Sequence, residues 1–231
     1  MKPQYVKQLL RMTEILKVDV SNRRGAAFQQ VIQRAVKVLQ DGGVIAVPTD
    51  TIYGLAALSQ NTEAISKIYN IKGRHDEKPI AISVGSVADI AKWSQVSVPT
   101  ALLNDLLPGP VTVVFERETN LNPGLNPTTN LVGVRVPDHT FIQELALAAN
   151  SPLALTSANV SSAQSTLSIQ EFQSLWPKLD LIVDAGVLSD SRAGSTVVDL
   201  SHQGQYAIIR PGSALPQTLR IVRDKYGLTE R

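Results

Sequence analysis

Several short segments of the sequence combine hydroxyl, amide and cationic side chains, the groups that proteins use to hold anionic ligands. In residues 48–55, PTDTIYGL, two threonines, an aspartate and a tyrosine follow directly after an apolar run. Threonine and aspartate also build turns by bonding to their own backbone, but a turn has no need of a tyrosine. The segment therefore fits either a ligand site or a turn, and its residue types alone favour neither.

Two cations lie close together in Lys72-Gly73-Arg74, at the end of a predicted helix. Arginine is a planar fork and lysine a point charge, so the pair is suited to clamping a phosphate. Cations at a helix C-terminus also complement the helix dipole without binding a ligand. The spacing alone leaves both interpretations open.

Further polar groups follow or interrupt other apolar segments. Residues 156–159, TSAN, with Ser165 behind them, offer groups for an oxyanion or a nucleotide, although a serine-rich turn has the same composition. Ser195 precedes one apolar run, Arg210 ends another, and Arg135 lies inside a third. An unpaired buried arginine is costly, so we expect Arg135 to meet a carboxylate, either of the protein or of a ligand.

The elements that position these groups alternate between helical and strand periods, which predicts an α/β (α+β-like) fold. Residues 44–47, VIAV, are expected to form a strand buried on both faces, ended by Pro48. Thr62 is the expected N-cap of a helix over 63–71, and Ser86 that of a helix over 87–93. The other expected strands are 79–84, 111–115, 131–136, 153–156, 181–183, 196–200 and 206–209, and the other expected helices are 28–39, 139–149, 168–176 and 216–226. Together they predict one twisted, mixed β-sheet with helices packed on it and a ligand crevice beyond the strand ends.

Composition limits the remaining possibilities. The 231 residues are 43% hydrophobic and 18% charged, with a mean hydropathy of +0.02, as in an ordinary globular protein. There is no cysteine, no apolar stretch long enough for a membrane span and no pair of histidines at metal-ligand spacing, so we expect no disulfide, no integral membrane segment and no resident metal. The standard nucleotide-binding glycine loops, the nucleophile elbow and the H-E-x-x-H motif are also missing.

The charge is unevenly divided along the chain. Residues 1–24 hold six basic and two acidic residues, a charge of +4, and the remainder holds 16 basic and 18 acidic residues, a charge of −2. We expect residues 1–24 to be a basic tail or a weak targeting segment, followed by one domain over 25–228. The body is not a nucleic-acid binder by bulk charge.

In this order the segments resemble the YrdC family of threonylcarbamoyl-AMP synthases. The resemblance runs from about residue 26 to residue 228, and the combination of motifs is highly specific. It implies a single YrdC-type domain with a concave ligand crevice, in the short form without the family's second C-terminal domain, and closest to the animal members. The matching segments are PTDTIYGL at 48–55, KGR at 72–74, KP at 78–79, LPGPVTVV at 107–114, GVRVP at 133–137, LTSAN at 155–159, GSTVVDL at 194–200 and IIRPG at 208–212.

The resemblance implies a nucleotidyltransferase that converts L-threonine, bicarbonate or CO2 and ATP, carried with Mg²⁺, into threonylcarbamoyl-AMP and pyrophosphate. The product would pass to a tRNA threonylcarbamoyl-transfer complex, which modifies the adenosine beside the anticodon of ANN-decoding tRNAs. The implied location is the cytoplasm, with the mitochondrion as a second compartment. The family's catalytic residues carry over to Lys72, Arg74, Ser157 and Asn159, its ATP-binding residues to these four with Ser165 and Arg210, and its threonine-binding residues to Thr49, Tyr53, Arg135 and Ser195.

One position departs from the family pattern, because many members carry a histidine where this sequence has Ser83. The alternative function is a non-catalytic module that binds RNA or tRNA. A related domain also serves carbamoyl transfer in hydrogenase maturation, but beside cysteine-rich regions that a chain without cysteine cannot contain. We expect Lys72→Ala and Arg74→Ala to reduce turnover far more than stability, because both side chains are expected at the crevice and not in the core.

Overall fold

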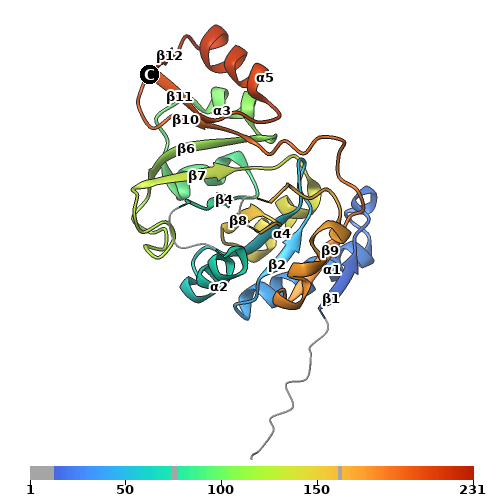
Figure 1. Cartoon of the computed structure of the whole chain (residues 1–231). Helices are drawn as coiled ribbons and strands as arrows, with labels where there is room; N and C mark the ends of the chain where they lie inside the picture. The colour runs from blue at the N-terminus through green and yellow to red at the C-terminus, as the bar shows by residue number, and fades with distance from the viewer. Residues whose placement is uncertain (1–12, 74–77, 161–162) are drawn as a thin grey trace, which may run out of the picture.

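A computed structural model describes residues 13–73, 78–160 and 163–231 (Figure 1). Within these residues one 12-stranded mixed sheet runs in the order β1-β9-β2-β3-β8-β4-β7-β6-β10-β11-β12, and β5 pairs with β6 off this path. The mixed α/β architecture expected from the alternating periods is confirmed. The strands are β1 (Glu14–Lys17), β2 (Ile45–Val47), β3 (Gly54–Leu58), β4 (Ala81–Ser83), β5 (Ser94–Gln95), β6 (Val111–Arg117), β7 (Leu131–Arg135), β8 (Leu153–Ser157), β9 (Leu181–Asp184), β10 (Thr196–Asp199), β11 (Gln205–Arg210) and β12 (Thr229–Glu230).

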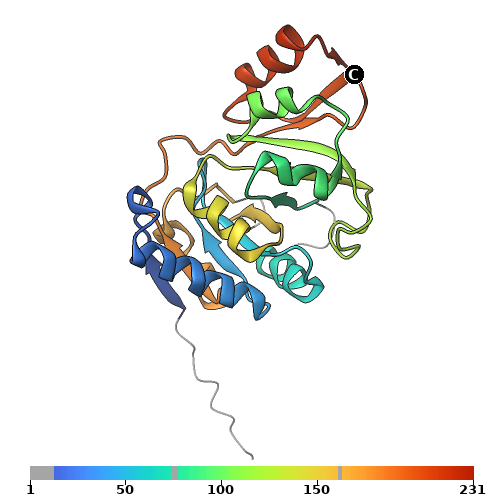
Figure 2. The same cartoon turned by 180° about the vertical axis from the view of Figure 1, so that it is seen from behind.

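Helices cover both faces of this sheet. Helices α1 and α4 lie side by side on one face, which Figure 2 shows from the front, and α2 and η3 lie on the other. The α-helices are α1 (Ala26–Gln40), α2 (Thr62–Lys72), α3 (Thr100–Leu106), α4 (Thr140–Ala149) and α5 (Leu215–Leu219), the 3₁₀ helices are η1 (Val20–Asn22), η2 (Val87–Lys92) and η3 (Ile169–Lys178), and the π-helix is η4 (Arg220–Lys225).

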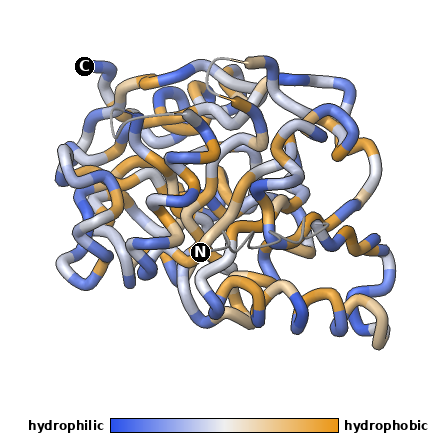
Figure 3. Tube along the Cα trace, turned by 60° about the horizontal axis from the view of Figure 1, so that its bottom comes forward, coloured by the Kyte–Doolittle hydropathy of each residue, from blue (hydrophilic) through white to orange (hydrophobic). Residues whose placement is uncertain are grey.

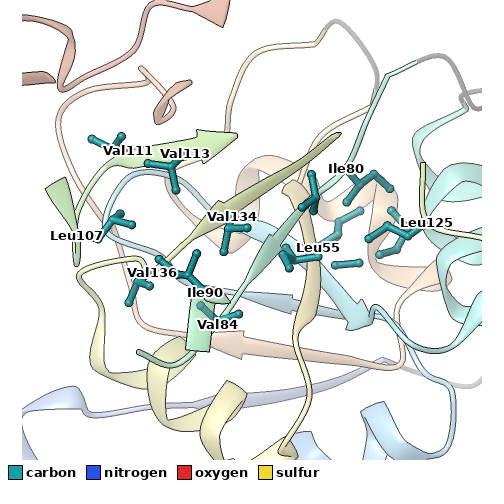
Figure 4. Close-up of a cluster of buried hydrophobic side chains, with 14 of the residues drawn as sticks. Leu55, Ile80, Val84, Ile90, Leu107, Val111, Val113, Leu125, Val134 and Val136 are labelled. Carbon is teal, nitrogen blue, oxygen red and sulfur yellow. The ribbon is translucent and has the colours of Figure 1, made fainter. Parts of the chain in front are cut away.

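The period of two along each strand explains the two hydrophobic cores. In β2, Ile45 and Val47 pack with α1 and α4, whereas Ala46 and the preceding Val44 join the larger cluster on the opposite face. This strand is therefore buried on both faces, as its uninterrupted apolar run predicts. Figure 4 shows part of the larger cluster, and Figure 3 shows hydrophobic and hydrophilic residues alternating along the trace.

The N-terminal part of the chain differs from the expected tail. Residues 14–17, inside the segment 1–24, form β1, which pairs in parallel with β9 at the edge of the sheet. A parallel neighbour supplies backbone hydrogen bonds to a strand of only 4 residues, and this pairing with a strand distant in the sequence has no signal in the charge pattern. The interpretation as a tail is therefore wrong for these residues, and the boundary at residue 24 otherwise stays a prediction.

Two helix caps also differ from the predictions. Helix α2 is capped by Asn61 and not by Thr62, because the Asn61 side chain accepts a hydrogen bond from the Ala64 N–H at 3.0 Å. Ser86 occupies the expected N-cap position, but its hydroxyl donates to the Asp89 carboxylate and the element that follows is a 3₁₀ helix.

Candidate active site

A cavity of about 630 Å³ lies over the middle strands of the sheet, a size suited to a small-molecule ligand or a cofactor. Segments far apart in the sequence meet there because the sheet order brings β3, β8, β4, β7, β6 and β10 next to one another. The described lining residues are Thr49, Ile52, Tyr53, Gly54, Lys78, Pro79, Ile80, Ala81, Thr112, Val114, Thr129, Leu131, Gly133, Arg135, Leu155, Thr156, Ser157, Gly194, Ser195, Val197, Ile209 and Arg210.

The charge of this cavity has one sign. The charged side chains in the described lining are Lys78, Arg135 and Arg210, and all of them are cations. Burial lowers the pKa of Arg135 and of Arg210, but an arginine starts so far above neutrality that both guanidinium groups stay charged. The cavity therefore favours an anionic ligand.

The floor of the cavity is kept open by small residues. A Cβ atom on Gly133 would lie 3.0 Å from Thr112 Cγ2 and 3.4 Å from Ala81 Cβ, so a larger residue would press on the neighbouring strands. A Cβ atom on Gly54 would lie 2.6 Å from Leu155 Cδ1. Glycine at both positions lets the backbone of the sheet itself form the wall of the site.

Lys72 lies behind the cavity wall and holds the end of β8. Its Nζ donates to the Ser157 carbonyl at 2.6 Å, to Ser157 Oγ at 3.1 Å and to Asn159 Oδ1 at 2.7 Å. Ser157 Oγ in turn donates to Asn159 Oδ1 at 2.6 Å. Helix α2 ends at Lys72, and its C-cap is Gly73, whose left-handed φ of 63° suits glycine.

The exposed fraction of Lys72 is only 1%, which corrects the expectation that it lies at the crevice and outside the core. A lysine is buried at this depth only where its charge is well bonded. Replacing Lys72 must therefore cost stability, contrary to the expectation of a small effect on stability. The structure thus brings three of the predicted catalytic residues together, whereas Arg74 lies outside the described residues.

Arg135 meets a carboxylate of the protein itself. Its guanidinium donates to Asp50 Oδ1 and, at 2.9 Å, to Thr51 Oγ1. The second oxygen of Asp50 accepts the Asp138 N–H at 3.0 Å. The sequence left open whether Arg135 pairs with a protein carboxylate or with a ligand, and the structure gives the first partner while leaving Arg135 on the cavity wall.

Asp50 was missing from the predicted site residues, although its segment was singled out. The sequence did indicate that Arg135, inside an apolar strand, requires a carboxylate. It could not identify Asp50 as that carboxylate, because the two residues are 85 positions apart and no spacing rule joins them. Thr112 and Lys78 also line the cavity without having been predicted. Thr112 was hidden because it lies inside an apolar strand.

Ser195, Thr112 and Arg210 form the opposite side of the cavity. The two hydroxyl groups of Ser195 and Thr112 lie 2.8 Å apart, and Arg210 donates to the Ser195 carbonyl at 2.8 Å. A Cβ atom on Gly212 would lie 2.4 Å from the Ser195 carbonyl carbon, so glycine is required for this close approach. These contacts fix the predicted threonine-binding serine beside the predicted ATP-binding arginine.

Tyr53 lines the cavity but uses its hydroxyl elsewhere. The phenol donates to the Gly186 carbonyl at 2.8 Å and accepts the Ala185 N–H at 3.0 Å. Burial raises the pKa of Tyr53 to about 12, so the phenol stays protonated. These two hydrogen bonds hold residues 185–186, which follow β9, against the segment 48–55 at the cavity.

Thr49 and Ser165 complete the predicted set. Thr49 lines the cavity, and its hydroxyl donates to the Ile52 carbonyl at 2.7 Å, which shapes the turn between β2 and β3. Ser165 is absent from the described lining residues, and its carbonyl accepts a hydrogen bond from Arg192 at 2.7 Å.

The described residues offer no ready-made metal centre. They contain no group of three or more histidine, cysteine, aspartate or glutamate side chains placed to hold a metal ion. The described cavity lining also lacks a carboxylate, the side chain that Mg²⁺ prefers. These residues therefore do not fit a resident Mg²⁺ site.

The fold and the site together define an α/β domain with a cavity of cationic lining over the middle of a mixed sheet. A family model described as "Telomere recombination", Sua5/YciO/YrdC, matches residues 37–212. The chain belongs to this family, which confirms the resemblance stated from the sequence.

Individual relatives agree with this assignment. A human protein named threonylcarbamoyl-AMP synthase is 49% identical over 226 residues, covering 96% of this chain and 81% of the human one. A solved structure of Sua5 from P. abyssi is similar with a TM-score of 0.79 at 27% identity, covering 87% of this chain and 61% of that chain. A second structure of P. abyssi Sua5, complexed with L-threonine, has a TM-score of 0.82 at 24% identity over 95% of this chain and 62% of that one, which supports the fold.

Proposed function

We propose that this protein is a threonylcarbamoyl-AMP synthase, a nucleotidyltransferase that acts on L-threonine, bicarbonate or CO2, and ATP. The observation that carries the proposal is the cavity whose charged lining is wholly cationic and which contains Thr49, Arg135, Ser157, Ser195 and Arg210. The reaction brings two carboxylate-type anions and a triphosphate into one site, so it requires this kind of charge. The name of the human relative points to the same activity.

The chemistry needs positioning more than a reactive side chain. The amine of threonine attacks bicarbonate with loss of water, or CO2 with loss of a proton to solvent, to form a carbamate. A carbamate oxygen then attacks the α-phosphorus of ATP and displaces pyrophosphate. Both bonds form between substrates, so the protein contributes orientation and charge stabilisation. Cations and fixed hydroxyl groups are sufficient for this, which is consistent with the missing nucleophile elbow.

We assign two sets of residues around the cavity to different substrates. Thr49, Arg135 and Ser195 receive threonine, with Tyr53 in the same wall. Ser157 and Arg210, on the cavity wall, receive ATP and bicarbonate; Lys72 and Asn159 belong to the same set but act from behind Ser157, to which they are bonded, and Arg74 and Ser165 are added from the family resemblance. The hydrogen bond from Arg210 to the Ser195 carbonyl supports a shared site, because it places one residue of each set side by side, as the attack of the carbamate on the α-phosphorus requires.

Mg²⁺ enters this proposal only as part of the substrate. Because the described lining supplies no carboxylate, we propose that the ion arrives on the phosphates of ATP. It would supply charge neutralisation there.

The test is pyrophosphate release from ATP by the purified protein, with and without L-threonine and bicarbonate, together with detection of the adenylate by mass. We expect release only when both substrates are present. Arg210→Ala should abolish it, whereas Arg223→Ala, which changes a surface arginine paired with Asp224, should not. Failure of the wild type to bind ATP would refute the proposal and favour a non-catalytic RNA-binding module.

The biological setting follows from the same proposal. A labile adenylate must be consumed soon, so we propose that the product passes to the tRNA threonylcarbamoyl-transfer complex, with at most a weak contact to tRNA by this chain. No helix in the part of the chain that the structure describes is long and apolar enough to cross a membrane. We propose the cytoplasm as the compartment, and the mitochondrion as a second one.

A further inference from the structure

The connection between β6 and β7 is organised around one arginine. Arg117, the last residue of β6, donates to the carbonyls of Leu125 at 2.6 Å, Leu121 at 3.0 Å and Asn122 at 2.5 Å. One guanidinium therefore holds the turns of this connection in place. The residues that follow, including Thr129 and Leu131, reach the cavity wall.

Asn126 projects from this connection into the protein and is 1% exposed. Its side-chain amide donates to the Ile80 carbonyl at 2.9 Å, and its Oδ1 accepts the Ile80 N–H at 2.8 Å. The ladder of β4 with its neighbours begins at Ala81, so Ile80 lies just beyond it. Asn126 thus gives Ile80 the pair of hydrogen bonds that a neighbouring strand would give.

The same side chain also contacts helix α2. The Tyr69 hydroxyl donates to Asn126 Oδ1 at 3.3 Å, and Tyr69 lies one helical turn before Lys72. Asn126 therefore joins the cavity wall around Lys78 and Ile80 to the helix that carries the buried lysine. Its backbone φ of 52° is in the left-handed region, which asparagine tolerates better than other residues with a side chain.

We propose that Asn126 is a positioning residue for the ATP side of the site. It is absent from the described lining and acts through Ile80 and Tyr69, by fixing the wall that holds Lys78 and the helix end that holds Lys72. The threonine side, with Thr49, Arg135 and Ser195, is held by other contacts. This inference rests on the proposed function, because it assigns Lys72 to the nucleotide.

Asn126→Gly tests the proposal, because glycine accepts the left-handed backbone and removes only the side-chain hydrogen bonds. We expect the KM for ATP and the dissociation constant of ATP to rise by about tenfold or more, since small displacements of positioned groups have large effects. The KM for threonine should stay within about twofold of the wild-type value, because the side chain of Asn126 bonds to Ile80 and Tyr69 and not to Thr49, Arg135 or Ser195. Asn126→Asp, which keeps the acceptor but sets a buried carboxylate oxygen against the Ile80 carbonyl, should raise the KM for ATP at least as much as Asn126→Gly.

The matched control is Asn61→Ala, which removes an asparagine from the other end of the same helix. It should lower the urea midpoint but leave the KM for ATP within about twofold. The proposal would be overturned if Asn126→Gly changed the KM for ATP and the KM for threonine equally, or if Asn126→Gly bound ATP as tightly as Asn61→Ala does.

A separate outcome concerns the proposed function. If the wild type binds ATP but releases no pyrophosphate, the proposed function fails and the ATP dissociation constants of the variants still test Asn126. A wild type that binds no ATP would overturn both.

Discussion

Replacing Asp50 by asparagine tests the central electrostatic feature of the site. The side chains of Asp50 and Arg135 are only 10% and 8% exposed, and they form a buried ion pair. Asp50 also accepts the Asp138 N–H, so both of its oxygens are used. Asparagine keeps the shape but removes the charge, and its NH2 group must then face a donor on one of the two sides.

The cost follows from this geometry. Removing one partner of a buried ion pair typically costs about 3–5 kcal/mol, because it leaves an uncompensated charge. Arg135 keeps its hydrogen bond to Thr51 and borders the cavity, so we take the lower end and expect a loss of about 3 kcal/mol in the free energy of unfolding. A domain with an ordinary stability of about 5–15 kcal/mol remains folded after this loss.

Urea unfolding measures the loss, and a double-mutant cycle isolates the pair. Asp50→Asn combined with Arg135→Met should cost less than the sum of the single changes by about 2 kcal/mol. Glu14→Gln is the control, because the Glu14–Arg34 pair is 38% and 40% exposed and should contribute less than about 1 kcal/mol. If Asp50→Asn costs no more than Glu14→Gln, the buried pair does not stabilise the site and the reasoning is refuted.

Other changes probe three further positions. Lys72→Met removes the donor to Ser157 and Asn159, so pyrophosphate release should fall about 100-fold and the free energy of unfolding should fall by about 2–3 kcal/mol. An unchanged urea midpoint would contradict the buried position of Lys72. Ser83 Oγ is buried without a partner among the described residues. Ser83→Ala should therefore raise the free energy of unfolding by up to about 1 kcal/mol and leave the KM for threonine unchanged. An increased KM would show that this hydroxyl binds threonine. Burial lowers the pKa of His139 below its usual 6.5, so the unfolded chain binds the extra proton as the pH falls through 6.5 towards the folded-state pKa, and stability is lost in that window. The free energy of unfolding, measured with urea at a series of pH values below 6.5, should therefore fall by up to about 1.4 kcal/mol per pH unit less in His139→Asn than in the wild type. Identical pH profiles of the two proteins would argue against a lowered pKa of His139.

The longest apolar runs of the sequence predicted their strands well. Residues 111–115 and 153–156 lie in strands of the sheet, and so do residues 131–136 except for Val136, because branched apolar side chains suit a pleated surface. Strand β3 was missed because its sequence, GLAAL, is built from glycine, alanine and leucine. Its pairing with β2 and β8 overrides that weak propensity, which local sequence cannot reveal.

The site was predictable to the extent that its residues follow strands. Thr49, Ser157 and Arg210 mark the ends of apolar segments, and all of them line the cavity. The depth of Lys72 was not predictable, because a lysine at a helix C-terminus is usually exposed. Its burial results from the course of β8, which places carbonyl, hydroxyl and amide oxygens around the ammonium group.

The buried position of Lys72 also explains how a site without a nucleophile can be effective. An ammonium group in water reorients freely, and bulk solvent screens its charge. At the end of α2, oxygens of Ser157 and Asn159 fix its direction, and burial lowers the local dielectric constant. The Ser157 hydroxyl, whose residue lines the cavity, is thereby held in one orientation by Lys72 and Asn159. Under the proposed function, a cavity wall that is already fixed does not have to reorganise as charge develops on the α-phosphate, which links the stability cost of burying the lysine to the reaction rate.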